Sequence, residues 1–370
     1  MTASSGSVTS GGVDVSVVST AHDVADARLH RITAALVDVG LAVELIGLGD
    51  ASGAPPDVPV RTMRRRSLLT RAIRSLTVPV GARGSVLLTV DPDLVPAASL
   101  MRLLSRRRLV VDVHEDFRAL LLDRPWAQGI VGWLARRMVA LSESLAARAD
   151  LTVVADDHVP PIQARHRLVV RNVPDRRRLP AARQLDPEPR AVYVGDVRGS
   201  RGLYTMLDAI ERAPGWRLDI VGPLAPSDTA PVERWRRTSG AAARVVLHGR
   251  MPPEQAWALA AGAWCGFALL DRTPAFLDAV PSKLYEYLTV GIPVLVTPLP
   301  RMVAIVDESG AGAVVASADE VVRRLTEWEH DRPTVEDMSR RGSRWTIRAV
   351  PDAPYRLLAT AVRSLVPDRS

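Results

Sequence analysis

Residues 13–46 read VDVSVVSTAHDVADARLHRITAALVDVGLAVELI, and this stretch decides the fold class. In its first six residues, apolar and polar side chains alternate and an apolar pair follows, which predicts a buried strand. Apolar side chains recur at helical spacing over residues 25–39, and Gly40 is a suitable helix stop. A second apolar run, at residues 41–46, completes a β-α-β unit. Because a helical crossover brings the second strand back parallel to the first, these residues predict the start of a parallel sheet.

Short apolar strands separated by helical stretches recur along the rest of the chain. The pattern breaks at residues 173–190, where prolines and charges accumulate as in a linker. We therefore expect an α/β protein with two doubly wound domains, at residues 1–172 and 191–344. A helix over residues 345–370 is expected to pack back toward the N-terminal domain. Further strands are expected at residues 85–90, 109–113, 151–154, 191–195, 218–222, 245–248, 265–270 and 293–297.

Composition indicates a soluble globular protein, with 47% hydrophobic and 24% charged residues among 370. The single cysteine, Cys265, excludes a disulfide framework, suits a reducing compartment and is expected in the core. Residues 1–7 lack the pattern of a signal peptide, and the apolar run at residues 256–270 is too short to span a bilayer. We therefore expect a cytoplasmic protein. No zinc spacing is present in the sequence, and no metal is expected.

Positive charge is concentrated in residues 60–109, which hold eleven arginines against two aspartates, within a net charge of +7 for the chain. Such a segment attracts phosphate, or it is simply a solvated arginine-rich face. From Arg61 to Arg74, apolar residues alternate with the arginines, as in a basic amphipathic segment that lies on an anionic membrane surface. Aromatic residues do not interleave with these arginines, so nucleic acid is not the expected partner.

Lys283 is the only lysine among the 48 Lys and Arg residues of the chain. It lies in the stretch PSKLYEY, residues 281–287, which reads as a helix start with Ser282 able to satisfy free N–H groups. Such a start is a natural seat for a diphosphate, and Lys283 adds a full charge there. Glu286, one turn on, suits two neighbouring hydroxyls, as on a ribose. The alternative is a local salt bridge of Lys283 beside an ordinary helix glutamate.

Residues 281–294, PSKLYEYLTVGIPV, resemble the donor-site signature of retaining glycosyltransferases with the GT-B fold, glycosyltransferase family 4. The resemblance implies two Rossmann-like domains facing a central cleft, and a Glu286 that binds the donor ribose. The signature has a second acid eight residues earlier. Asp278 stands there, where the family has glutamate, and the resemblance implies that it lies near the transferred sugar.

The resemblance extends over nearly the whole chain. Residues 111–117, VDVHEDF, are similar to a strand end of the family's N-terminal domain, where the histidine, here His114, contacts the transferred sugar. The segment Asp26-Ala27-Arg28 resembles a family pattern on the acceptor side, and His22 and Asp23 lie on the same loop.

Residues 195–202, GDVRGSRG, are similar to the loop that opens the family's C-terminal domain. Two basic residues of that loop bind the donor diphosphate. Arg201 matches the second, but Asp196 stands at the first, so Arg198 is expected to take over. A backbone as glycine-rich as that at Gly195 also lets phosphate approach closely. The segment His248-Gly249-Arg250 resembles the loop beside the base, which implies backbone contacts from Gly249 and Arg250.

The resemblance implies transfer of a sugar from a UDP-, GDP- or dTDP-sugar to a hydroxyl acceptor with retention at the anomeric carbon, without metal or other cofactor. The leaving diphosphate would take the acceptor's proton. A glycan or a lipid-linked molecule is the expected acceptor, in the synthesis of cell-envelope glycan, glycolipid or exopolysaccharide, with the enzyme at the inner face of the membrane.

Three other functions stay open on the sequence. One is an epimerase or hydrolase of nucleotide sugars on the same scaffold. Another is a non-catalytic anion-binding protein that uses the arginine cluster. The third is a pyridoxal-phosphate phosphorylase with Lys283 as the Schiff-base lysine, a family whose chains are far longer.

Overall fold

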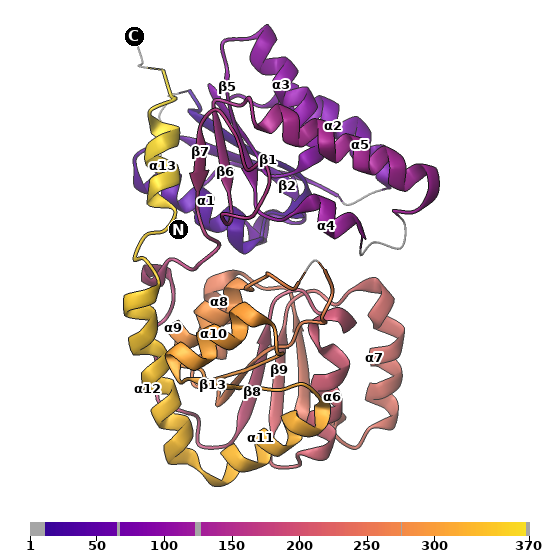
Figure 1. The fold of residues 1–370 in the computed structure, drawn as a ribbon, viewed down its shortest axis with the longest axis vertical. Coiled ribbons are helices and arrows are strands. Elements are labelled where there is room, and N and C mark those ends of the chain that lie inside the picture. Colours follow the sequence, from indigo (N-terminus) through magenta and orange to yellow (C-terminus); the bar gives the residue numbers. More distant parts are fainter. Residues whose placement is uncertain (1–11, 65–66, 123–126, 275, 368–370) are drawn as a thin grey trace, which may run out of the picture. The chain divides into compact units, whose positions relative to one another are not determined.

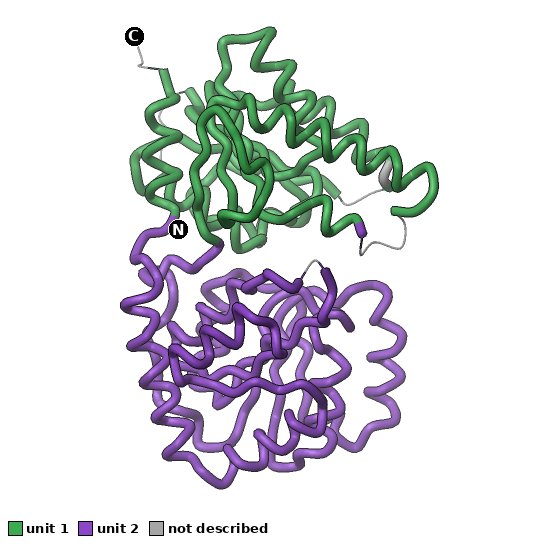
Figure 2. Tube along the Cα trace, viewed as in Figure 1, with its two compact units in different colours: residues 1–121, 126–171, 355–370 green, residues 122–125, 172–354 purple. Residues whose placement is uncertain are grey.

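The computed structural model describes residues 12–64, 67–122, 127–274 and 276–367. The chain divides into two compact α/β units, which Figure 2 shows in different colours. Unit 1 is built on the chain up to residue 171 together with the tail from Tyr355, and unit 2 is built on residues 172–354. The last helix of the chain therefore belongs to unit 1.

Unit 1 is a parallel sheet with helices on both faces, as the opening β-α-β unit predicts (Figure 1). Its described strands are β1 (Val15–Asp23), β2 (Val43–Leu48), β3 (Val60–Met63), β4 (Val86–Thr89), β5 (Arg108–Val113), β6 (Leu151–Val154) and β7 (Arg167–Val169). Its described α-helices are α1 (Ala27–Asp38), α2 (Leu68–Gly81), α3 (Val95–Leu104), α4 (Phe117–Leu122), α5 (Gly129–Ala146) and α13 (Arg356–Arg363). Short 3-10 turns are η1 (Ala51–Gly53) and η2 (Pro92–Leu94).

The strand order in unit 1 is β3-β2-β1-β4-β5-β6-β7, so the direction of winding reverses between β1 and β4. One core lies between the sheet and α1 with α13, and it holds Leu29, Ile32 and Leu358. A second core on the other face holds Leu94 and Ala98 with residues of α5. The two cores bury the central strands on both sides, which explains their mainly apolar sequences.

Unit 2 repeats this architecture with a sheet in the order β10-β9-β8-β11-β12-β13. Its described strands are β8 (Arg190–Val194), β9 (Arg217–Val221), β10 (Val245–Gly249), β11 (Cys265–Ala268), β12 (Val294–Val296) and β13 (Gly312–Val314). Its described α-helices are α6 (Leu203–Arg212), α7 (Pro226–Thr238), α8 (Pro253–Ala260), α9 (Ser282–Thr289), α10 (Pro300–Ser309), α11 (Ala318–His330) and α12 (Arg332–Ala349). The 3-10 turns are η3 (Arg176–Arg178), η4 (Gly199–Arg201) and η5 (Ala242–Arg244).

The predicted α/β class and the parallel sheets are confirmed, and each expected strand is found within a few residues of its predicted place. Three strands escaped prediction: β3, β7 and β13, each at the edge of its sheet. Their residues are half-buried or exposed, so the sequence carries no continuous apolar run there. Cys265 is buried in the core of unit 2, as expected.

Two other segments differ from the expectation. Residues 173–190 are packed rather than loose, because Leu185 is buried and its backbone carbonyl accepts a hydrogen bond from Arg332. The single helix expected over residues 345–370 is two helices, α12 and α13. Pro351 and Pro354 separate them, since proline removes a backbone donor and restricts the residue before it. Within the described residues, no helix combines the length and apolarity needed to span a membrane.

Candidate functional site

The winding of unit 2 reverses between β8 and β11, and ligands of doubly wound sheets bind outside the carboxyl ends of the strands at such a point. Gly195 follows β8 directly, and α9 is the first helix after β11. The topology therefore brings two predicted phosphate-binding segments, the loop at residues 195–202 and the helix start at Lys283, to one edge of the sheet.

Lys283 lies buried beneath this loop, with 7% of its surface exposed. Its Nζ atom stands 3.5 Å from the centre of the Tyr193 ring, a cation–π contact. Among the described residues, Nζ has neither a hydrogen-bond partner nor an ion pair. Burial, with the charge of Arg201, lowers the pKa of Lys283 well below its usual range. The local salt bridge that the sequence left open is therefore absent from the described structure, and the amine keeps its donors for a ligand.

Gly195 provides the space above Lys283. Its φ is +131°, a conformation that side-chain-bearing residues rarely adopt, and a Cβ atom there would lie 3.0 Å from Lys283 Nζ. The loop is held from beneath, because the Gly195 amide donates to the Val221 carbonyl (2.8 Å) and the Tyr193 hydroxyl donates to the Asp196 carbonyl (2.7 Å). A phosphate oxygen could thus meet both a backbone loop and a buried amine.

Two tyrosines fix this arrangement, and sequence reasoning missed both. Burial raises the pKa of Tyr193 to about 12, so its ring stays neutral under Lys283. The Tyr287 hydroxyl, from α9, accepts a hydrogen bond from the Val194 amide at 2.9 Å and lies 3.3 Å from the Val192 carbonyl. Tyr287 thereby joins α9 to β8. In the sequence, the role of Tyr287 was indicated only by its position four residues after Lys283, on the same helix face.

The two arginines of the loop have different surroundings. Arg198 forms an ion pair with Asp196 at 2.8 Å. Asp196, which stands where the family has a basic residue, therefore partly neutralises the charge of Arg198, the residue expected to replace that basic group. Arg201, in η4, forms no ion pair in the described structure, and its charge acts on Lys283 and Tyr193. Arg201 is therefore the stronger candidate for a diphosphate contact.

Helix α9 begins without a side-chain cap, since Pro281 is its N-cap residue. Ser282 does not cap the helix as the sequence suggested. Its hydroxyl donates instead to Glu286 Oε2 at 3.3 Å. Glu286 is 6% exposed and lies one turn inside the helix. The structure thus brings Gly195, Arg201, Lys283, Ser282 and Glu286 into one region of unit 2.

The remaining candidates of unit 2 lie in other loops. Asp278 is exposed, and its backbone carbonyl accepts a hydrogen bond from Arg301 (2.8 Å), while no described contact joins it to Lys283. Gly249 ends β10 with a φ of +70°, and its carbonyl accepts from the Gly222 amide at 2.8 Å. Arg250 follows it with an exposed side chain.

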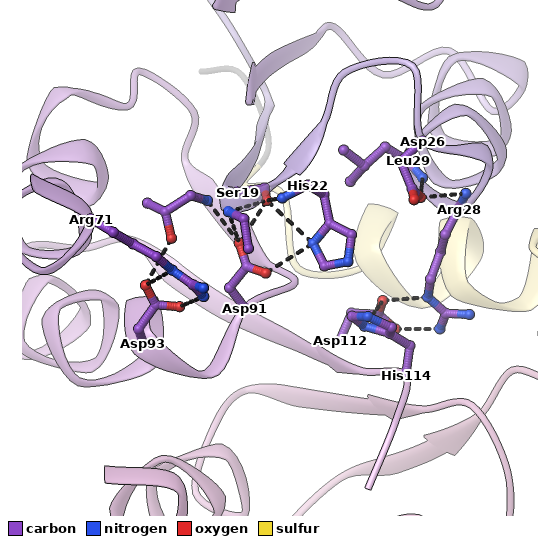
Figure 3. Close-up of polar contacts among 12 residues, drawn as sticks. Ser19, His22, Asp26, Arg28, Leu29, Arg71, Asp91, Asp93, Asp112 and His114 are labelled. Carbon is purple, nitrogen blue, oxygen red and sulfur yellow. Dashed lines mark hydrogen bonds and ion pairs between the residues drawn. The ribbon is translucent and has the colours of Figure 1, made fainter. Parts of the chain in front are cut away.

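Unit 1 has a polar cluster at its own switch point between β1 and β4 (Figure 3). His22 lies at the end of β1, Asp91 lies two residues after β4, and His114 directly follows β5. The rings of His22 and His114 meet edge to face with their centres 4.9 Å apart. His114 has 10% of its side chain exposed, and its Nδ1 atom has no described hydrogen-bond partner. Burial, with the charge of His22, lowers the pKa of His114.

Asp91 is the acid that the sequence did not single out. Its Oδ1 atom lies 2.9 Å from His22 Nδ1. Burial opposes a charge on His22, but Asp91 outweighs it and raises the pKa of His22 to about 9. No local sequence pattern indicated this pair, because Asp91 lies 69 residues after His22 in the chain.

Arg28, from the segment 26–28, forms a bidentate pair with Asp112 of β5, with both hydrogen bonds at 2.6 Å. Asp26 caps α1 through the amides of Arg28 and Leu29 (Figure 3). The hydroxyl of Tyr355 lies 3.2 Å from Arg28 Nη1. This part of the family pattern therefore joins α1, β5 and the C-terminal tail. In the described chain, no cluster of three or more His, Cys, Asp or Glu residues is suited to a metal ion.

Residues 175–345, most of unit 2, match the family model described as "Glycosyl transferases group 1". This segment is of the group 1 glycosyl transferase type. The glycine-rich loop, the buried lysine and the helix start all fall inside the matched segment. The glycosyltransferase has no match among curated proteins in sequence.

Solved structures share the fold over nearly the whole glycosyltransferase. Sucrose-phosphate synthase from Thermosynechococcus elongatus has a TM-score of 0.70 and 14% identity, over 95% of this chain and 98% of that one. Anabaena HepE, solved in complex with UDP and glucose, has a TM-score of 0.68 and 12% identity, over 96% of this chain and 100% of that one. WaaG, a glycosyltransferase involved in lipopolysaccharide biosynthesis, has a TM-score of 0.62 and 13% identity, over 96% of this chain and 100% of that one. At these identities the likeness shows the fold, two Rossmann-like domains of the GT-B type.

Proposed function

We propose that this glycosyltransferase moves a sugar from a nucleotide-diphosphate donor to a hydroxyl acceptor, with retention at the anomeric carbon. The observation that carries the proposal is the buried, unpartnered Nζ of Lys283 beneath the Gly195 loop. A buried amine without a partner is costly unless a ligand uses it. A diphosphate supplies acceptor oxygens and negative charge, and the switch point of the sheet is where such a ligand binds.

In the proposed reaction, Lys283 and Arg201 stabilise the negative charge that grows on the leaving diphosphate. Fixed donors in a site that excludes water are worth far more than the same charges in solution. The acceptor oxygen bonds to the anomeric carbon as the bond to the diphosphate breaks, and the diphosphate takes the acceptor's proton. Both events occur on one face of the sugar, which gives retention, the outcome that the resemblance of residues 281–294 implies.

Other roles follow the family pattern. Glu286 would bind the two ribose hydroxyls, and its place one turn inside α9 supports this role. His114 would contact the transferred sugar from unit 1, and Asp278 would lie near it. Gly249 and Arg250 would face the base, with Arg198 as a weaker diphosphate contact because Asp196 already pairs with it.

The donor class is proposed from two lines of support. HepE was solved in complex with UDP-glucose, with UDP, and with UDP and glucose. Glu286 suits a ribose, which UDP- and GDP-sugars carry with both hydroxyls. We therefore place UDP-sugars first, GDP-sugars next and dTDP-sugars last. WaaG takes part in lipopolysaccharide synthesis, which favours a glycan or lipid-linked acceptor in cell-envelope synthesis.

We further propose that unit 1 binds an anionic membrane surface, with the protein at the inner face of the membrane. Helix α2 packs against α3, and α3 against α5 (Figure 1). Large apolar side chains on these helices are half or more exposed, and α2 and α3 contain no acidic residue. The segment from Arg61 to Arg74 contributes only its helical part, since Arg61 lies in β3. The exposed apolar residues are Leu69, Ile73, Leu76, Val80, Leu100, Leu103, Leu104, Ile130, Leu134 and Leu141.

A thermal-shift panel of UDP-, GDP- and dTDP-sugars tests the donor proposal. A ligand that binds only the native state at a hundredfold its Kd adds about 2.7 kcal/mol of stability. We expect one nucleotide class to raise the melting temperature by several degrees, and Lys283→Ala to remove most of the rise. Glu254→Ala, an exposed acid on α8, serves as the control and should keep it. No rise with any of the three classes would contradict the proposed donor site.

A further inference from the structure

The polar cluster at the switch point of unit 1 contains a histidine whose ring is held by a carboxylate. Asp91 is 3% exposed, and its carboxylate receives hydrogen bonds on both oxygens. The Ser19 hydroxyl (2.6 Å) and the amides of Thr20 (2.7 Å) and Ala21 (3.0 Å) donate to Oδ2, which leaves Oδ1 for His22 Nδ1. Burial would raise the pKa of Asp91, but the charged His22 and these donors hold it well below its usual range. Asp91 is therefore a fixed anion that orients the ring.

This orientation leaves the second nitrogen of His22, Nε2, unused. Ring atom Nδ1 takes the contacts with Asp91 and Ser19, and no described residue bonds to Nε2. The His22 side chain is 26% exposed, so the ring is accessible although Asp91 is not. Imidazole rings held in this way by a carboxylate have a defined tautomer and present the other nitrogen to a ligand.

The charges around His22 select the class of ligand. Asp91 lies after β4, Asp26 lies ahead of α1, and Glu115 lies after β5, and all three favour the charged ring. His114, with its lowered pKa, is the neutral neighbour. Three carboxylates around one imidazolium make a poor site for another anion. A neutral hydroxyl, which can accept a hydrogen bond from Nε2–H, fits this surrounding.

We propose that His22, oriented by Asp91, binds the acceptor of the transfer by donating a hydrogen bond from Nε2 to the reacting hydroxyl of a carbohydrate. The proposal rests on the proposed function, and it names the acceptor side of that reaction. His22 touches the acceptor, while Asp91 and Ser19 are positioning residues. The contact between the His22 and His114 rings brings this hydroxyl beside the residue that the family pattern assigns to the sugar.

A donated hydrogen bond is consistent with retention. When Nε2–H donates to the acceptor oxygen, the proton of the hydroxyl stays free. As the new carbon–oxygen bond forms and the bond to the diphosphate breaks, that proton passes to the diphosphate, and His22 keeps its own. A neutral His22 would instead take the proton itself, as a general base does. The ionisation of His22 therefore separates a hydrogen-bond donor from a general base.

The first test measures the ionisation of His22 by NMR of the imidazole nitrogens in the full-length protein. His22 is assigned among the seven histidines with His22→Gln. We expect both ring nitrogens of His22 to be protonated at neutral pH and Asp91→Asn to lower the pKa. Octyl glucoside, octyl galactoside and octyl mannoside serve as probes. At least one should shift the His22 signals and leave those of the exposed His158 in place. A neutral His22, or signals that no probe shifts, would overturn the proposal.

The second test separates acceptor from donor effects with the glycoside that shifts His22. For His22→Gln, we expect kcat/KM for transfer to the glycoside to fall roughly tenfold to a hundredfold, as for loss of one charge-assisted hydrogen bond. Release of the nucleotide to water and the donor-induced thermal shift should stay within twofold of wild type. Asp91→Asn should reproduce the loss, and His158→Gln should have no effect. Equal losses in transfer and hydrolysis would place His22 on the donor side and overturn the proposal. Failure of donors to bind wild type would overturn the proposed function instead.

Discussion

At the scale of single residues, the surroundings of Lys283 explain why this position holds a lysine in a chain whose other basic residues of this kind are arginines. Its Nζ sits 3.5 Å from the centre of the Tyr193 ring and directly below Gly195, in a space that a compact ammonium fills. A guanidinium is wider, stays charged when buried and presents a planar fork. The lowered pKa of Lys283 means that the buried amine can lose its charge when no anion is bound.

Donor binding should therefore take up a proton. A diphosphate stabilises the charged amine, so the pKa of Lys283 is higher in the complex than in the free protein, and affinity should rise as pH falls. We expect titration calorimetry at about pH 8, in buffers of different ionisation enthalpy, to show net proton uptake when the donor binds. Lys283→Arg, which is charged in both states, is the control and should show little uptake. Identical heats in all buffers for wild type would exclude this linkage.

Sequence reasoning found the residues of this site that belong to local motifs. Lys283 and Glu286 stand one turn apart, and Gly195 and Arg201 share a short loop, so spacing alone could group them. Tyr193 and Asp91 were missed because their partners lie 90 and 69 residues away in the chain. Only the topology of the sheets brings those partners together. Arg28 was placed on the acceptor side, yet it is buried in a pair with Asp112.

At the scale of secondary structure elements, the central strands were predictable, but the edge strands β3, β7 and β13 were not. A strand buried on both faces, such as β6, is mainly apolar, and β6 was predicted with its observed bounds. The edge strand β7 has no fully buried residue, so its sequence does not differ from that of a loop. Prolines separate α12 from α13, and their effect was underestimated because the apolar residues continue on both sides.

The exposed apolar residues of α2, α3 and α5 give an element-scale prediction. Leu103 of α3 is 76% exposed on the proposed membrane face, and Leu357 of α13 is 65% exposed on the helix that covers the other face of the sheet. We expect Leu103→Asp to weaken co-sedimentation with anionic vesicles, because it removes apolar contact and adds repulsion. Leu357→Asp should bind as wild type does, and binding of wild type should weaken at high salt.

Two results would contradict the membrane proposal. One is equal binding of wild type to neutral and anionic vesicles, which would remove the role of the arginines. The other is equal loss of binding in Leu103→Asp and Leu357→Asp, which would show that no particular face is used. Circular dichroism of both variants controls for loss of the fold.

At the scale of the whole molecule, the two-unit architecture followed from repetition of the β-α pattern. The sequence did not predict that residues 173–190 pack against unit 2. That packing depends on single contacts, such as the hydrogen bond from Arg332 to the Leu185 carbonyl. The tail returns to unit 1 through Tyr355 and Leu358, which join the core beside α1. Each unit has a polar cluster at its own switch point, one with a buried amine and one with a carboxylate-held histidine. The proposed reaction assigns the donor to the first and the acceptor to the second.

The rate of nucleotide release from the donor sugar in Lys283→Ala and Arg201→Ala, relative to wild type, tests this assignment most directly. Removing one preorganised donor to a developing oxyanion typically costs about 10²–10³ in rate. We predict that each variant loses at least about tenfold in kcat while its melting temperature without ligand stays close to wild type. Near-normal kcat in both variants would contradict the claim that this cluster stabilises the leaving diphosphate.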